Sequence, residues 1–106
     1  MRRETPARHE RPAIDEAALA AARDAERLLA VARKRDSGRW IEFLEPLPDA
    51  LRDGALPDLR GVARRARAAY GHKDSIRDAL PGELTEPLLA DLDRLLKLLA
   101  REDANT

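Results

Sequence analysis

Arg60, Arg64 and Arg67 are the side chains whose type and spacing come closest to a chemical site in this sequence. At about 100° per residue they lie on one side of a predicted helix, opposite its apolar residues. His72 and Lys73 follow about one turn later and extend the positive charge. Because guanidinium groups bind phosphate and carboxylate oxygens through paired hydrogen bonds, these five residues predict a surface that binds an anion or a protein partner.

This arginine face, made of Arg60, Arg64 and Arg67, has three interpretations. A nucleic acid would contact it through backbone phosphates, with Tyr70 stacking on a base. An acidic protein surface would use the same guanidinium groups. The simplest alternative is that the arginines only solvate the outer face of an amphipathic helix. The chain carries 20 acidic and 20 basic residues, and this balance excludes a strongly basic nucleic-acid coat protein.

Two pairs of glutamates have the i, i+3 spacing found in helical di-metal proteins, Glu42 with Glu45 and Glu83 with Glu86. They admit a carboxylate-metal hydrolase as a further hypothesis. No Glu-x-x-His motif accompanies them, and the first pair is predicted to point to water, away from the apolar residues nearby. Cysteine is absent, and the few serines stand at predicted turns or helix caps. We therefore expect no catalytic residue, no metal and no cofactor.

A wide leucine stripe, Leu88, Leu92, Leu95, Leu96 and Leu99, marks the last predicted helix. The five side chains fall on one broad arc of the helix, which is wide for a single partner helix. One interpretation is a central helix contacted by two others within the same monomer. The other is a symmetric helix–helix interface between copies of the chain, for which two-fold dimers are the commonest arrangement.

The elements that must position these side chains are all helical. Apolar residues recur with helical period, and no strand-like alternation is present, so we predict an all-α bundle of three principal helices with shorter connecting helices. The expected helices cover residues 13–35, 39–45, 58–71, 74–80 and 85–101, with one or two further turns before Gly54. Residues 1–12 are expected to be a disordered tail, and residues 13–106 a single domain.

Two local signals set helix boundaries in this prediction. Gly38 is expected to adopt the left-handed conformation that ends the first long helix. Thr85 is expected to cap the start of the last helix, with Glu86 and Pro87 in its first turn.

These observations favour a non-enzymatic helical protein-interaction module, either homo-oligomeric or an accessory subunit of another protein. A regulator that binds nucleic-acid phosphates through the arginine face is the main alternative. No stretch of the sequence is apolar over the length of a membrane span or a signal peptide, so we expect a cytoplasmic protein with no membrane partner.

Overall fold

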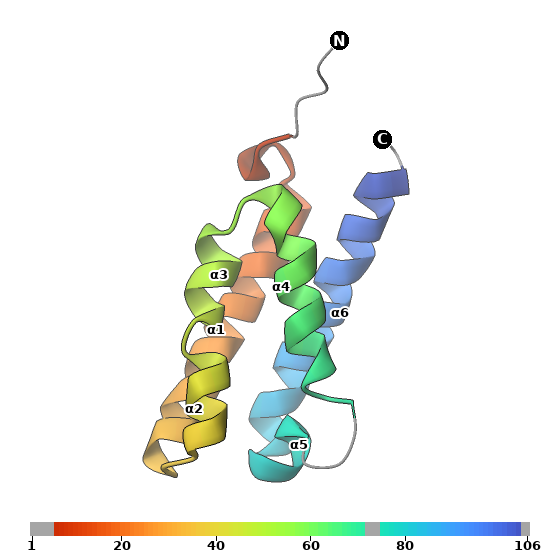
Figure 1. Ribbon diagram of the computed structural model, residues 1–106. Coiled ribbons are helices and arrows are strands. Elements are labelled where there is room, and N and C mark those ends of the chain that lie inside the picture. Colours follow the sequence, from red (N-terminus) through yellow and green to blue (C-terminus); the bar gives the residue numbers. More distant parts are fainter. Residues whose placement is uncertain (1–5, 72–74, 105–106) are drawn as a thin grey trace.

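Residues 6–71 and 75–104 are described by a computed structural model, and every element within these ranges is helical (Figure 1). In chain order the elements are η1 (Arg8–Glu10), α1 (Pro12–Lys34), α2 (Gly38–Leu44), α3 (Leu47–Asp53), α4 (Leu56–Ala68), α5 (Ile76–Ala79) and α6 (Gly82–Ala104). The predicted all-α fold is confirmed, with α1, α4 and α6 as the principal helices and α2, α3 and α5 as the shorter ones.

The helices form an antiparallel bundle with four sides, one of which is built from α2 and α3 together. Helix α1 packs against α6 and against both α2 and α3, while α4 packs against α3 and α6. Figure 1 shows α2 and α3 following one another along α1. Pro46 separates them, because a proline has no N–H with which to continue the hydrogen bonds of α2. None of the helices described is long and apolar enough to cross a membrane.

Alanines form the buried face of α1. The side chains of Ala17, Ala18, Ala21 and Ala25 are fully buried, and Ala22 is buried almost completely. Such short side chains let a neighbouring helix approach closely. Helix α6, which packs most extensively on α1, supplies fully buried leucines in return. The core therefore combines a small-residue helix with a large-residue helix.

The end of α1 differs from the prediction. Asp36, and not Gly38, adopts the left-handed conformation, with φ of 55°. The Ser37 N–H donates to the Ala32 carbonyl at 3.0 Å, and the Asp36 N–H donates to the Arg33 carbonyl at 3.2 Å. This is the Schellman arrangement, which occupies the last free carbonyls of the helix. Gly38 is instead the first residue of α2.

The start of α6 also differs, because the helix begins at Gly82 and not after Thr85. The Pro81 carbonyl accepts hydrogen bonds from the N–H groups of Leu84 and Thr85, both at 3.0 Å. Thr85 is thus inside the helix and fully buried. The cap prediction was wrong. It places Pro87 in the first turn, but the observed helix begins about one turn earlier and Pro87 lies inside it.

Part of the segment expected to be a disordered tail is held against the bundle. Arg8, in η1, donates hydrogen bonds to the carbonyls of Leu51 and Arg52 at 2.7 Å and of Gly54 at 3.0 Å. Its guanidinium also contacts the Asp15 carboxylate at 2.8 Å. The side chain is only 12% exposed. These carbonyls lie at the end of α3 and just beyond it, and they have no partner within that helix, so a single arginine anchors η1 there.

Candidate functional site

Two of the three residues of the arginine face are engaged by acids of α6. Arg60 forms an ion pair with Asp103 and donates a hydrogen bond to the Leu99 carbonyl at 3.3 Å. Arg67 donates to the Asp93 carboxylate at 2.8 Å. Only Arg64 is exposed without an ion pair or hydrogen bond to the rest of the described chain. The predicted face therefore lies along the contact between α4 and α6, where it is largely neutralised.

The neighbours predicted to assist anion binding are also placed differently. His72 and Lys73 lie outside the described residues. Tyr70 is only 6% exposed and donates its hydroxyl to the Thr85 carbonyl at 2.6 Å, so its ring cannot stack on a base without leaving the core. Burial raises the pKa of this phenol above its ordinary range. Tyr70 is thus a neutral hydrogen-bond donor within the bundle.

The leucine stripe is mostly core. Leu88, Leu92 and Leu95 are fully buried and Leu99 is 4% exposed, while Leu96 is half-buried. Helix α6 lies between α1 and α4, and both pack against it, which explains why its apolar arc is so wide. This arrangement matches the first interpretation, in which the last helix is central and is contacted by two others of the same monomer. Leu96 is the only residue of the stripe that is exposed enough to contact another copy of the chain.

The glutamate pairs are surface residues. Glu42 and Glu83 are exposed, and Glu45 lies 3.6 Å from an Arg33 guanidinium nitrogen. Glu86 accepts two hydrogen bonds from Arg77, at 2.9 and 2.6 Å. These bonds hold the pKa of Glu86 below its ordinary value and raise that of Arg77. Over residues 6–71 and 75–104 no three acidic or histidine side chains converge as a metal site would require.

A groove of about 310 Å³ with a mostly apolar lining lies between α2, α3 and α4. Its apolar lining comes from all three helices: Phe43, Pro46, Leu47, Ala50, Val62 and Ala66. Two charged residues complete the walls, Glu42 from α2 and Arg65 from α4. Both are exposed, and neither forms an ion pair or hydrogen bond with another described residue. The groove thus has an apolar floor and one unpaired charge of each sign.

Aromatic packing fixes the α2 wall of this groove. Phe43 meets Trp40 edge to face, with ring centroids 5.7 Å apart and an interplanar angle of 87°. Trp40 is buried, whereas Phe43 is half-buried and turns part of its ring to the groove. Because Trp40 holds the ring by an arrangement that aromatic pairs favour, Phe43 is a preorganised apolar contact.

The α4 wall carries Gly61 one turn before Arg65. A β-carbon at position 61 would meet only the end of the Arg65 side chain, at 3.4 Å. No backbone approaches this glycine closely enough to require it. The absence of a side chain there instead leaves space beside the Arg65 guanidinium.

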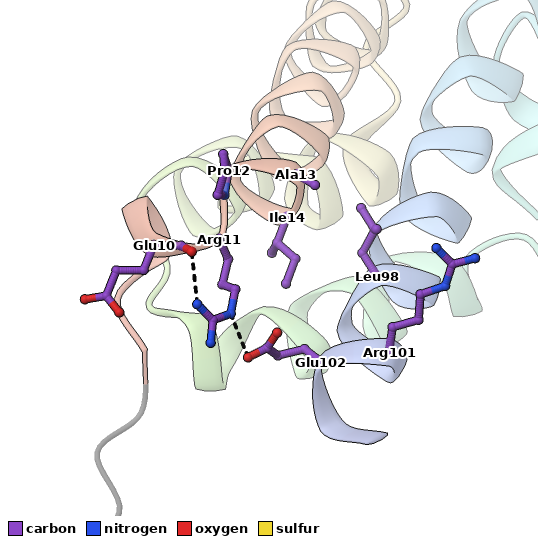
Figure 2. A pocket seen from close by; sticks show the side chains of 8 residues that line it. All are labelled: Glu10, Arg11, Pro12, Ala13, Ile14, Leu98, Arg101 and Glu102. Atoms are coloured by element: carbon purple, nitrogen blue, oxygen red, sulfur yellow. Dashed lines mark hydrogen bonds and ion pairs between the residues drawn. The ribbon is translucent and has the colours of Figure 1, made fainter. Parts of the chain in front are cut away.

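A second pocket, of about 250 Å³, lies between the start of α1 and the end of α6 (Figure 2). Ile14 and Leu98 line it from the two helices. Arg11 donates to Glu102 at 2.7 Å and to the Glu10 carbonyl at 3.0 Å, so these charges satisfy one another. Arg101 also lines this pocket and forms no ion pair with another described residue, whereas the groove carries an unpaired charge of each sign. The groove is therefore the stronger candidate.

Comparison with models of protein families, with curated proteins and with solved structures finds no match for this chain. The groove and its two unpaired charges are therefore the features from which a function can be inferred. The apolar spacing of Trp40, Phe43, Leu44 and Leu47 predicts that they share one face, but it does not predict that part of this face stays open. That feature depends on how α4 lies beside α2 and α3, and the local sequence carries no signal for it.

Proposed function

We propose that this protein is a non-enzymatic interaction module that binds an amphipathic helix of another protein in the groove between α2, α3 and α4. The single observation that carries the proposal is the mostly apolar groove flanked by the unpaired charges of Glu42 and Arg65. A cytoplasmic location, expected from the sequence, belongs to the same proposal.

The physical basis is helix-in-groove recognition. Apolar side chains of the ligand helix would displace water from Phe43, Leu47 and Val62, and burial of apolar area supplies most of the affinity of such contacts. The groove has room for about one or two large aliphatic side chains, at the lower end of the range for small binding pockets. A basic edge of the helix would face Glu42 and an acidic edge would face Arg65, which sets its orientation.

A partner of different sequence fits the groove better than a second copy of this chain. The leucines that a symmetric interface would use are in the core. Over the described ranges, Leu19 on α1 is the one large apolar residue counted as exposed, at 36%. A second copy would therefore have little to insert into the groove. These observations favour the accessory-subunit form of the hypothesis over homo-oligomerisation.

The phosphate-binding alternative has less support. Arg60 and Arg67 would have to give up their bonds to α6 before they could bind a phosphate. Of the arginines on α4, only Arg64 and Arg65 are free of such bonds. Two adjacent exposed arginines on a neutral protein supply little of the counterion release on which nucleic-acid affinity depends.

The test uses two synthetic helical peptides with the same apolar face. The first has one basic and one acidic edge, and the second has two basic edges. We expect the mixed-edge peptide to bind the wild-type protein several-fold more tightly, with amide chemical-shift changes centred on the groove. In Arg65→Glu both walls are acidic, so the preference should reverse.

Arg101→Glu is the matched control, because Arg101 is exposed, unpaired and away from this groove. It should bind both peptides as the wild type does. The proposal would be rejected if neither peptide saturated the shifts of groove residues, or if Arg65→Glu left the preference unchanged. Light scattering on the same samples tests the homo-oligomer alternative, for which the mass would be a multiple of 11.8 kDa.

A further inference from the structure

Asp24 is an acidic residue in the core. It lies on α1 beside the alanine face and is 8% exposed. Its nearest cation is Arg27, whose guanidinium nitrogen lies 3.7 Å from Asp24 Oδ1 and whose side chain is 66% exposed. The other oxygen, Oδ2, is buried and accepts no hydrogen bond from the described residues. A buried carboxylate oxygen without a donor is costly, so this oxygen needs an explanation.

The neighbour of Asp24 across the helix contact is a second acid. Asp91, half-buried on α6, lies within hydrogen-bonding reach of Asp24 and acts on it through its charge. Two ionised carboxylates can only accept hydrogen bonds, so they cannot bond to each other. The contact becomes a hydrogen bond when one of the two carries a proton. A shared proton therefore explains both the proximity of the acids and the missing donor for Oδ2.

The surrounding groups do not supply another donor. Tyr70 lies near Asp24 but gives its hydroxyl to the Thr85 carbonyl. Arg23 and Arg27 are exposed residues of α1 itself and act on Asp24 through their charge alone.

The charged residues that join α1 to α6 and to α3 are engaged with one another. Glu16 of α1 lies 3.9 Å from Arg94 of α6. On the α3 flank, Arg52 pairs with Glu26 and with Asp49. These ion pairs therefore provide no unpaired cation that would stabilise the ionised form of Asp24.

Burial is the largest effect on Asp24, followed by the hydrogen bond and the charge of Asp91, and together they raise its pKa to about 7. The two nearby arginines oppose this change without cancelling it. Sharing of one proton by two adjacent carboxyl groups follows the same physics as other acidic dyads.

We propose that Asp24 and Asp91 share one proton across the contact between α1 and α6, and that release of this proton to water weakens the contact as the solution approaches neutral pH. The pair is thus a proton-dependent latch between the two longest helices. This proposal is independent of the groove, which lies between other helices.

The direction of the pH dependence follows from linkage. In the unfolded chain Asp24 loses its proton near its ordinary pKa of 3.8, whereas the folded protein keeps it until about pH 7. Between these values the folded state binds more protons, so the latch contribution to stability is complete below the unfolded pKa and falls as pH rises. For one proton, the unfolding equilibrium constant rises by up to tenfold per pH unit within the window, and the effect levels off above about pH 7.

The experiment is urea denaturation between pH 4.5 and 8 for the wild type, Asp24→Asn and Asp53→Asn. Asparagine keeps the shape of Asp24 and donates a hydrogen bond to Asp91 without a buried charge. We expect Asp24→Asn to lose the latch part of the pH dependence and to be more stable than the wild type at pH 8. Asp53, exposed and without a bonded partner among the described residues, is the control and should keep the wild-type slope.

A direct measurement keeps the proposal testable if Asp24→Asn does not fold. Carbon NMR of the side-chain carboxyl groups in the wild type should show Asp24 titrating with a midpoint near 7. If Asp24 instead loses its proton below about pH 4.5, as ordinary carboxyls do, the shared proton does not exist. An Asp24→Asn variant with the same pH slope as Asp53→Asn would overturn the proposal equally.

Discussion

Asp36 has the one left-handed backbone conformation found among the described residues, and it ends α1. An L-residue in this conformation brings its β-carbon close to the following carbonyl oxygen, at a cost that glycine avoids. Aspartate tolerates the conformation better than most residues, but its negative charge lies at a helix C-terminus, where the partial charge is also negative. Position 36 is therefore a local site of strain that substitution can relieve.

Asp36→Gly should raise the free energy of unfolding by about 0.5–1 kcal/mol, because relief of the left-handed strain outweighs the extra freedom of glycine in the unfolded chain. Chemical denaturation at pH 7 measures the change. Asp36→Ala, which has a β-carbon but no polar side chain, should lower stability instead. If the glycine variant were no more stable than the alanine variant, strain at this position would not be significant.

At the scale of the elements, Arg8 attaches η1 to α3. Helix α3 has only seven residues, so its terminal carbonyls are a large part of its backbone. Arg8 supplies donors to three carbonyls at that end and pairs with Asp15 at the start of α1. One side chain thereby joins η1, α1 and α3, and it occupies carbonyl groups that a short helix cannot satisfy internally.

Arg8→Ala should lower the free energy of unfolding by about 2 kcal/mol, the scale of a set of hydrogen bonds from a charged group in a partly buried position. Arg101→Ala, which removes an exposed and unpaired arginine, should change it by less than about 0.5 kcal/mol. Thermal and urea denaturation of both variants measure the difference. Equal stabilities for the two would mean that η1 does not anchor the bundle.

For the whole molecule, the decisive arrangement is the central position of α6. Helices α1 and α4 pack on it from two directions, and its buried leucines join them into one core. Adjacent leucines of the stripe consequently have different roles: Leu95 is fully buried and Leu96 is half-buried. Substituting each in turn separates a core role from an interface role.

Leu95→Ala should lower the free energy of unfolding by about 3 kcal/mol, because it removes buried methyl groups and leaves a cavity. Leu96→Ala should cost less than about 1 kcal/mol. Light scattering should find both variants and the wild type at 11.8 kDa. A wild-type mass above this value that falls in Leu96→Ala would show that the stripe also joins copies of the chain.

Local patterns predicted most of the helices but not how they meet. The apolar period placed α1, α2, α4 and α6 within a few residues of their observed bounds, because that period is a property of neighbouring residues. Helix ends were less predictable. Gly38 carries a strong local signal for a helix end, yet Asp36 is the left-handed residue that ends α1. Thr85 carries a strong local signal for a helix start, yet α6 begins at Gly82. Backbone geometry at both positions follows from the packing of the next element.

The sequence by itself determined the helical fold, the apolar face of each helix and the neutral charge balance, which all depend on composition or on residues within one or two turns. Only the tertiary structure decided that the leucine stripe is core, that acids of α6 neutralise most of the arginine face, and that Asp24 meets Asp91. It also decided that the α2–α4 groove stays open with Glu42 and Arg65 unpaired. Each of these results joins residues on different helices, and such pairings depend on how whole faces pack together, which no local pattern specifies.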